Sequence, residues 1–243
     1  PMMTKIVRAL GIIFFVALSA LSIFLSLAGR DLDDPRLKAV TAIPSYFEDR
    51  FYDIRMGQTL DRFQPDPRIV LADIDDNSIQ KIGTWPLPRK TYATLIDKLG
   101  TFGAKVIAFD VFFPEPAPSC GADTPDQLFA ESVKRFSEDP SRKVILAYSL
   151  NVDGTIGERE FAELPEDLYN FVMDTKQSEG VNLKPMSVSR DIYPIKPLID
   201  AGGALAHIEA VADSDGILRH YNLVGNVGDI YLPSFSLLAY EAF

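Results

Sequence analysis

The first pattern in the chain is a long run without charge. Residues 9–29, between Arg8 and Arg30, are uncharged and mostly apolar. At about 1.5 Å per residue, a helix of this length spans roughly 30 Å, the thickness of a bilayer's hydrocarbon core. The core of a cleavable signal peptide is usually shorter, although the small residues at 26–29 leave cleavage open. We therefore predict a transmembrane anchor over residues 1–30.

Beyond the anchor, apolar residues recur at alternating steps of three and four. They are Leu37, Val40, Pro44, Phe47, Phe51 and Ile54. This heptad spacing predicts a juxtamembrane helical stalk over residues 31–64, which Pro44 should break or restart because proline lacks an N–H. The seam either pairs with a second copy, giving a homodimer through residues 37–54, or packs on its own domain.

From residue 65 onward, strand-like and helix-like patterns alternate. Continuous apolar runs, which are typical of strands buried on both faces, lie at 68–74, 105–113 and 144–150. Helical periodicity occupies each connection, at 88–99 and 128–136. Strand–helix–strand units form right-handed parallel crossovers. Residues 65–243 are therefore predicted to be a layered α/β domain with a mostly parallel sheet.

The C-terminal part of the chain gives weaker signals. Turn residues at 213–216 separate two strand-like runs, at 204–212 and 217–225, and this predicts a β-hairpin. His207 and His220 would then lie on facing strands. Residues 167–176 suggest a short helix, and residues 234–243 have helical composition. We also expect the domain to be incomplete at its C-terminus.

The distribution of charge predicts the orientation of the chain in the membrane and the class of partner it can bind. The chain has 24 basic and 34 acidic residues, and all of the acidic ones lie beyond residue 30. This balance disfavours nucleic acid, whose phosphates would be repelled. Lys5 and Arg8 precede the anchor, so the N-terminus is expected in the cytoplasm and residues 31–243 outside the inner (cell) membrane, in a periplasm. A single cysteine, Cys120, excludes an intrachain disulfide and a multi-cysteine zinc cluster.

Six residues form the candidate ligand-binding site. They are Asp73, Asp75, Asp76, Trp85, Arg89 and Asp110. The three neighbouring aspartates end the first predicted strand and Asp110 lies late in the second, so all would meet at the carboxyl edge of a parallel sheet, where ligands of open α/β folds bind. The structural alternative is that Asp76 caps a helix and that Arg89 pairs with Asp75 or Asp110.

The same carboxylates allow a second interpretation, a metal-dependent phosphohydrolase using Asp73, Asp75 and Asp110. The Asp-x-Asp spacing resembles that of haloacid-dehalogenase-like phosphatases, but Asn77 stands where their motif has a threonine. The chain has neither a Gly-rich phosphate loop nor a nucleophile elbow. We therefore assign no catalytic residue and no metal site, and expect no cofactor.

Several segments together resemble the second CHASE family, the extracellular sensory domains associated with cyclases and histidine kinases. They include Ala-Asp-Ile-Asp-Asp (72–76) and Trp-Pro-Leu-Pro-Arg (85–89). The matching stretches are 47–55, 66–79, 83–89, 99–113, 206–219 and 232–236.

The resemblance implies the sensory input region of a membrane-anchored receptor for an unknown stimulus, with an adenylate or guanylate cyclase as the expected effector and a kinase as another. No cyclase or kinase motif occurs in these 243 residues. An extracytoplasmic interaction module without a small ligand is the alternative.

Overall fold

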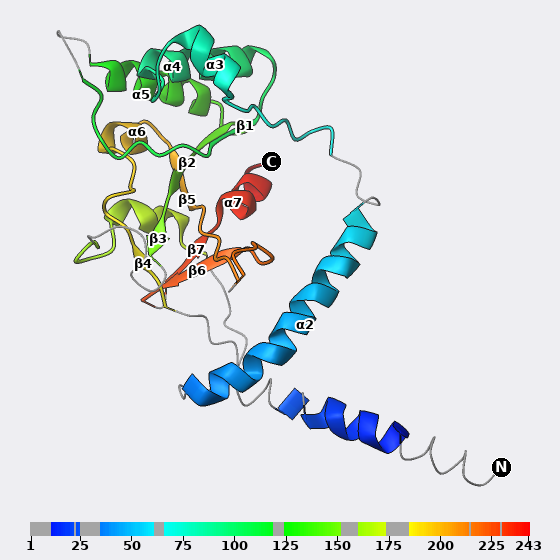
Figure 1. Ribbon diagram of the computed structural model, residues 1–243. Coiled ribbons are helices and arrows are strands. Elements are labelled where there is room, and N and C mark those ends of the chain that lie inside the picture. The colour runs from blue at the N-terminus through cyan, green and yellow to red at the C-terminus, as the bar shows by residue number, and fades with distance from the viewer. Residues whose placement is uncertain are drawn as a thin grey trace. The chain divides into compact units, whose positions relative to one another are not determined.

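The computed structural model describes the chain in two compact units, residues 1–73 and 74–243 (Figure 1). Each unit is described by itself. The residues that the structure describes are 11–21, 23–24, 35–60, 66–118, 124–151, 160–173, 185–213, 215–228 and 230–243.

The first unit contains the predicted stalk as one helix, α2 (Pro35–Leu60), of 26 residues. The predicted break at Pro44 is wrong, because α2 continues through it. One missing backbone hydrogen bond does not end a helix that has several turns on either side. Phe47, Phe51 and Ile54 all remain exposed along α2. The unit therefore leaves the C-terminal half of the predicted seam uncovered.

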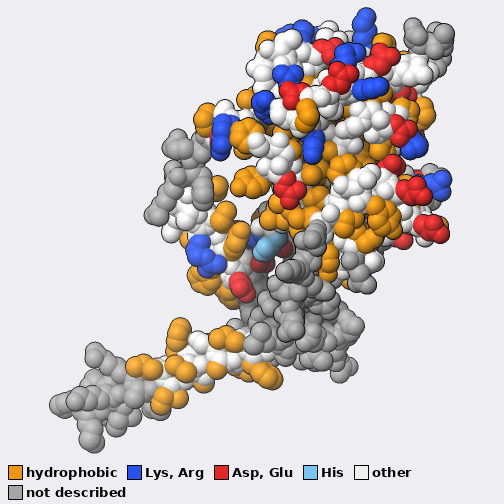
Figure 2. All heavy atoms as spheres, turned by 180° about the vertical axis from the view of Figure 1, so that it is seen from behind, with side chains coloured by type: hydrophobic (Ala, Val, Ile, Leu, Met, Phe, Trp, Pro, Cys, Tyr) orange, Lys and Arg blue, Asp and Glu red, His pale blue; other side chains and the backbone are white. Residues whose placement is uncertain are grey.

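Residues 11–21 and 23–24 are also helical, and exposed hydrophobic side chains cover them (Figure 2). Residues 1–10, 22 and 25–30 of the predicted anchor lie outside the described residues. Within the described part of the chain, no helix combines the length and the apolar character needed to cross a membrane.

The second unit is built on a parallel sheet of three strands, β1 (Val106–Phe109), β2 (Lys143–Tyr148) and β5 (Ala204–His207). Their order is β1-β2-β5, with β2 in the centre. Val106 pairs with Lys143, and Ile145 with Ala204. Five of the six residues of β2 are buried, as its continuous apolar run predicts for a strand covered on both faces. The prediction of a mixed α/β fold with a parallel sheet is confirmed.

The predicted strand at 68–74 is not formed. The structure gives residues 69–74 no secondary structure, and Ile69, Val70 and Leu71 are 78%, 82% and 91% exposed. An apolar run becomes a buried strand only where a neighbouring strand and a covering layer accept it, and the described residues supply neither to this segment. The crossover predicted from this segment to the next strand is therefore absent.

One face of the sheet is covered by α4 (Arg89–Thr101) and α5 (Pro125–Ser137), which pack against each other (Figure 1). Tyr92 of α4 and Phe129 of α5 stack on each other and meet Phe109 of β1 edge-on. A capping box of Thr124 and Gln127 starts α5. Two shorter helices, α3 (Asp76–Ile82) and α6 (Lys196–Asp200), flank this layer.

The other face of the sheet carries α7 (Phe235–Ala242). Leu238 of α7 packs on Ile145, Ala204 and Ala206. The two alanines are small, so a helix can approach the sheet closely at this point. The described part of the unit thus has a layer of helices on each face of a parallel sheet, which is the α/β arrangement.

Two small antiparallel ladders complete the unit. The first joins β3 (Leu150–Asn151) to β4 (Ser187–Val188), and the second is a hairpin of β6 (Val224–Val227) and β7 (Ile230–Pro233). A C-terminal hairpin is present, but not at the predicted residues. The run predicted as its first strand contains β5, which pairs with β2. A short 3₁₀ helix, η1 (Glu166–Phe171), replaces the helix predicted over 167–176.

Candidate functional site

The predicted aspartates have different local surroundings. Asp75 is the N-cap of α3: its carboxylate accepts hydrogen bonds from the Ser78 backbone N–H at 2.8 Å and the Ser78 hydroxyl at 2.7 Å. These bonds lower the pKa of Asp75. Asp76 is the first residue of α3 and is exposed, as is Asp73. An aspartate of this cluster therefore caps a helix, as predicted, but the cap is Asp75 and not Asp76.

Arg89 forms a buried ion pair, but with a partner that the sequence analysis did not consider. Its Nε donates to Oδ1 of Asp126 at 2.7 Å, and the two side chains are only 10% and 8% exposed. Arg89 also donates to the Glu115 carbonyl at 2.9 Å, and its guanidinium lies over the Phe113 ring. The expected pairing with Asp75 or Asp110 is therefore wrong.

The Asp126 carboxylate also anchors the loop before α5, since its Oδ2 accepts from the Ala117 N–H at 2.8 Å. The start of α4, this loop and the start of α5 are thereby tied together. The pair therefore has a structural role, because it ties three segments of the unit together.

The two remaining candidates lie apart from this pair. Trp85 is 52% exposed on the loop before α4, and Asp110 is exposed directly after β1. Among the described residues, which include Asp73, Asp75 and Asp110, no group of three His, Cys, Asp or Glu side chains is placed to hold a metal ion. The described residues thus give the phosphohydrolase hypothesis no structural support.

A buried polar group does occupy the carboxyl edge of the sheet. Ser149 follows β2, His207 ends β5, and Glu209 follows β5; all three are buried. The Ser149 hydroxyl donates to Oε2 of Glu209 at 3.1 Å, and the Glu209 N–H points to Nδ1 of His207 at 3.4 Å. Because these side chains are enclosed by the protein, the group connects the ends of β2 and β5 rather than presenting an open site.

Burial shifts both titrating members of this group toward their neutral forms. Burial lowers the pKa of His207 to about 4, although a hydrogen bond with the Leu232 backbone opposes the shift. Burial raises the pKa of Glu209, and the hydrogen bond from Ser149 opposes this in turn. The predicted facing of His207 and His220 is wrong, since His220 is exposed in a different loop.

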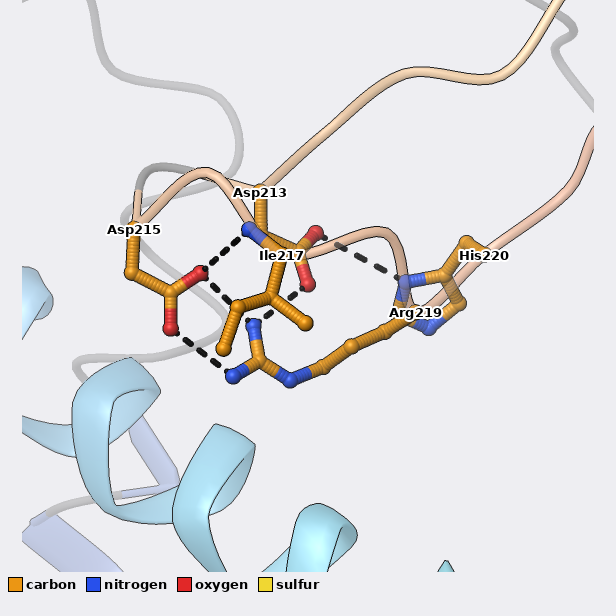
Figure 3. A network of polar contacts seen from close by, with 5 residues as sticks. All are labelled: Asp213, Asp215, Ile217, Arg219 and His220. Carbon is orange, nitrogen blue, oxygen red and sulfur yellow. Dashed lines mark hydrogen bonds and ion pairs between the residues drawn. The ribbon is translucent and has the colours of Figure 1, made fainter. Parts of the chain in front are cut away.

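That loop, between β5 and β6, is organised around Arg219 (Figure 3). The Arg219 side chain is only 2% exposed and forms ion pairs with Asp213 at 2.9 Å and Asp215 at 2.8 Å. The hydrogen bonds from Arg219 lower the pKa of Asp215 to about 2. The Asp215 carboxylate also accepts from the Ile217 N–H at 3.1 Å. The Asp213–Gly216 segment is a turn, as its residues indicate, but its carboxylates are held by arginine.

The described residues also form a cavity of about 430 Å³ away from these groups. It lies between α7, the end of η1 and the start of β2. Phe171, Met173 and Leu238 supply apolar walls, and Lys143 and Glu241 supply charge. The sequence gives no local signal for this cavity, because its lining comes from segments that lie far apart along the chain.

Comparison with known families identifies the chain. The family model of the CHASE2 domain matches residues 23–243. The chain belongs to the CHASE2 family. CHASE2 domains are sensory extracellular domains of signalling proteins. Neither the search of curated proteins nor the search of solved structures found a match.

The CHASE2 match confirms the family suggested by the sequence segments but assigns no residue a role. The sequence carried a signal for some contacts that were missed. Asp126 lies in the first turn of a predictable helix, where an acidic residue is favoured. An arginine that folds close to this turn can form an ion pair with it. Lys143 begins a predictable strand, but no local pattern connects it to Glu241, nearly a hundred positions later in this CHASE2 domain.

Proposed function

We propose that residues 31–243 are the extracytoplasmic sensory input region of a membrane-anchored signalling receptor. The observation that carries this proposal is the CHASE2 match over residues 23–243, because CHASE2 domains are sensory and extracellular. The uncharged run at 9–29 supports an anchor, since its length suits a bilayer. Lys5 and Arg8 before it support a cytoplasmic N-terminus.

The orientation is tested with the chain in its own membrane. In a Cys120→Ser background, a single cysteine replaces either Lys5 or the exposed Glu138. A membrane-impermeant maleimide should label the cysteine at 138 on spheroplasts, and the cysteine at 5 only after lysis. The opposite pattern, or labelling at 138 only after lysis, would refute the proposed orientation.

The effector that we propose is an adenylate or guanylate cyclase. Its support is the resemblance of the chain to sensory domains associated with cyclases. The full-length gene, expressed in a bacterium that lacks its own adenylate cyclase, should raise cyclic AMP or cyclic GMP. A kinase or diguanylate cyclase encoded beyond Phe243, with neither cyclic nucleotide formed, would show that the effector is of another class.

Signalling through such a receptor requires two states that the stimulus binds with different affinity. We propose that the two states are arrangements of a parallel homodimer, paired through residues 37–54 of α2. The exposed Phe47, Phe51 and Ile54 support this pairing, since they continue the heptad steps on one side of a helix. Anchoring in one plane raises the effective concentration of two copies, so a short seam suffices.

A further inference from the structure

We propose that the cavity between α7, η1 and β2 binds a small zwitterion with an apolar side chain, such as a free aliphatic α-amino acid. The cavity measures about 430 Å³, toward the lower end of the range for ligand pockets. This inference deepens the sensory role proposed above and rests on it for its biological meaning. The site itself is argued from the described residues alone.

The two charged residues reach the cavity from different elements. Lys143 is the first residue of β2, and alternate residues of a strand share a face, so Lys143 lies on the same side as Ile145. Ile145 packs against Leu238 of α7. Glu241 follows Leu238 by three residues and therefore lies on the same side of that helix. One cation and one anion thus border the cavity, with Leu238 between them.

These two charges have no ionic partner within the part of the chain that the structure describes. They also form no ion pair with each other, although both line the same cavity. A ligand with a carboxylate for Lys143 and an ammonium for Glu241 would satisfy both charges with charge-assisted hydrogen bonds.

The rest of the lining offers contacts for an apolar side chain. Beside the amide of Asn170, it includes the apolar residues Phe171, Val172, Met173, Pro233 and Leu238. Leu238 is buried, and Phe171 and Met173 are partly buried. The Met173 N–H donates to the Tyr231 carbonyl at 2.9 Å, which ties this wall to β7. The walls from β2 and α7 are held by regular structure, so these parts require little ordering on binding, and a small ligand gains from that.

Binding is measured by isothermal titration calorimetry on the full chain in detergent micelles. The probes are L-leucine, L-methionine and L-phenylalanine, each of which carries both charges and an apolar side chain. Two further probes carry one charge each, isoamylamine and 4-methylpentanoate. We expect the best zwitterion to bind roughly tenfold more tightly than either single-charge probe, because each of these leaves one protein charge unpaired.

Charge-removing variants assign the two contacts. Lys143→Met should weaken zwitterion binding about tenfold but leave the binding of isoamylamine unchanged. Glu241→Gln should also weaken zwitterion binding about tenfold, but leave the binding of 4-methylpentanoate unchanged. Lys134→Met and Glu131→Gln are matched controls on the exposed side of α5, and should bind like the unmodified chain. Thermal unfolding without ligand verifies that each variant is folded. If a variant does not fold, the single-charge probes on the unmodified chain still test the site.

The outcomes separate the site from the sensory role. The proposal is overturned if no zwitterion binds below about 10 mM, or if both charge variants bind the zwitterion as tightly as the unmodified chain does. Failure to bind would leave the cyclic-nucleotide test of the receptor untouched. Conversely, binding by the specified residues together with no cyclic-nucleotide response in the full-length protein would count against the proposed function and not against the site.

Discussion

The ion pair between Arg89 and Asp126 leads to the sharpest stability prediction. Asp126→Asn removes the charge with little change in volume, and it leaves the Arg89 guanidinium, 10% exposed, with only neutral acceptors, the new amide oxygen and the Glu115 carbonyl. Removing one partner of a buried ion pair costs about 3–5 kcal/mol. Since domains are stable by only about 5–15 kcal/mol, the variant should lose a large fraction of its stability.

The assay is a double-mutant cycle in urea, followed by far-ultraviolet circular dichroism. Arg89→Met removes the other charge, and the double variant leaves no orphaned ion. We expect the double variant to be more stable than the sum of the single losses predicts, by about 3 kcal/mol. The cycle measures this coupling directly, so losses that each substitution causes by itself cancel.

A matched control lies between the same two helices. Asp97 of α4 and Arg135 of α5 form an ion pair at 3.0 Å, but their side chains are 51% and 53% exposed. The corresponding cycle, with Asp97→Asn and Arg135→Met, should give a coupling of only about 0–1 kcal/mol, because water screens the pair. If the coupling of Arg89 with Asp126 is no larger than this, burial does not strengthen the pair as argued.

Three further predictions concern pH and assembly. Because the pKa of His207 is lowered from 6.5 to about 4, the unfolded chain binds the proton first, so the free energy of unfolding should fall by about 3 kcal/mol as pH falls from 6.5 to about 4. His207→Gln should remove that decline in urea titrations, and an unchanged decline would refute the assignment. Since burial raises the pKa of Glu209, its ionisation costs stability as pH rises, and Glu209→Gln should show a higher urea midpoint than the unmodified chain at about pH 8; a lower midpoint would contradict this. In a Cys120→Ser background, cysteine at Phe47 should crosslink dimers in membranes far more than cysteine at Glu48, whereas equal crosslinking would exclude the α2 seam.

The elements with strong local patterns could be predicted from the sequence. The periodicity of Tyr92, Leu95, Ile96 and Leu99 predicts a helix, and the structure has α4 there. The apolar run at 144–150 predicts a buried strand, and β2 occupies most of it. These predictions hold because a helix face or a doubly buried strand requires a particular order of apolar residues, whatever its neighbours are. The family also follows from segments of sequence.

The errors arise where a segment's state depends on a partner far along the chain. Residues 69–71 are as apolar as β2, yet they stay exposed because no strand pairs with them. The first run of the predicted hairpin became β5 because β2 lies beside it, while the hairpin formed from β6 and β7. A local pattern does not contain this information, since pairing is decided by which edges the folded chain brings together.

The charged contacts show most clearly what the local sequence determines and what only tertiary packing determines. The sequence alone indicated that Arg89 needs a carboxylate, since an arginine at a helix N-terminus is unfavourable for the helix dipole. Only the packing of α4 against α5 made Asp126 that partner, 37 positions away, while Asp75 was engaged as a local helix cap. The cavity is equally a tertiary product. Lys143 and Glu241 meet at it because a helix near the end of the chain covers a strand near its middle, and no spacing in the sequence records that contact.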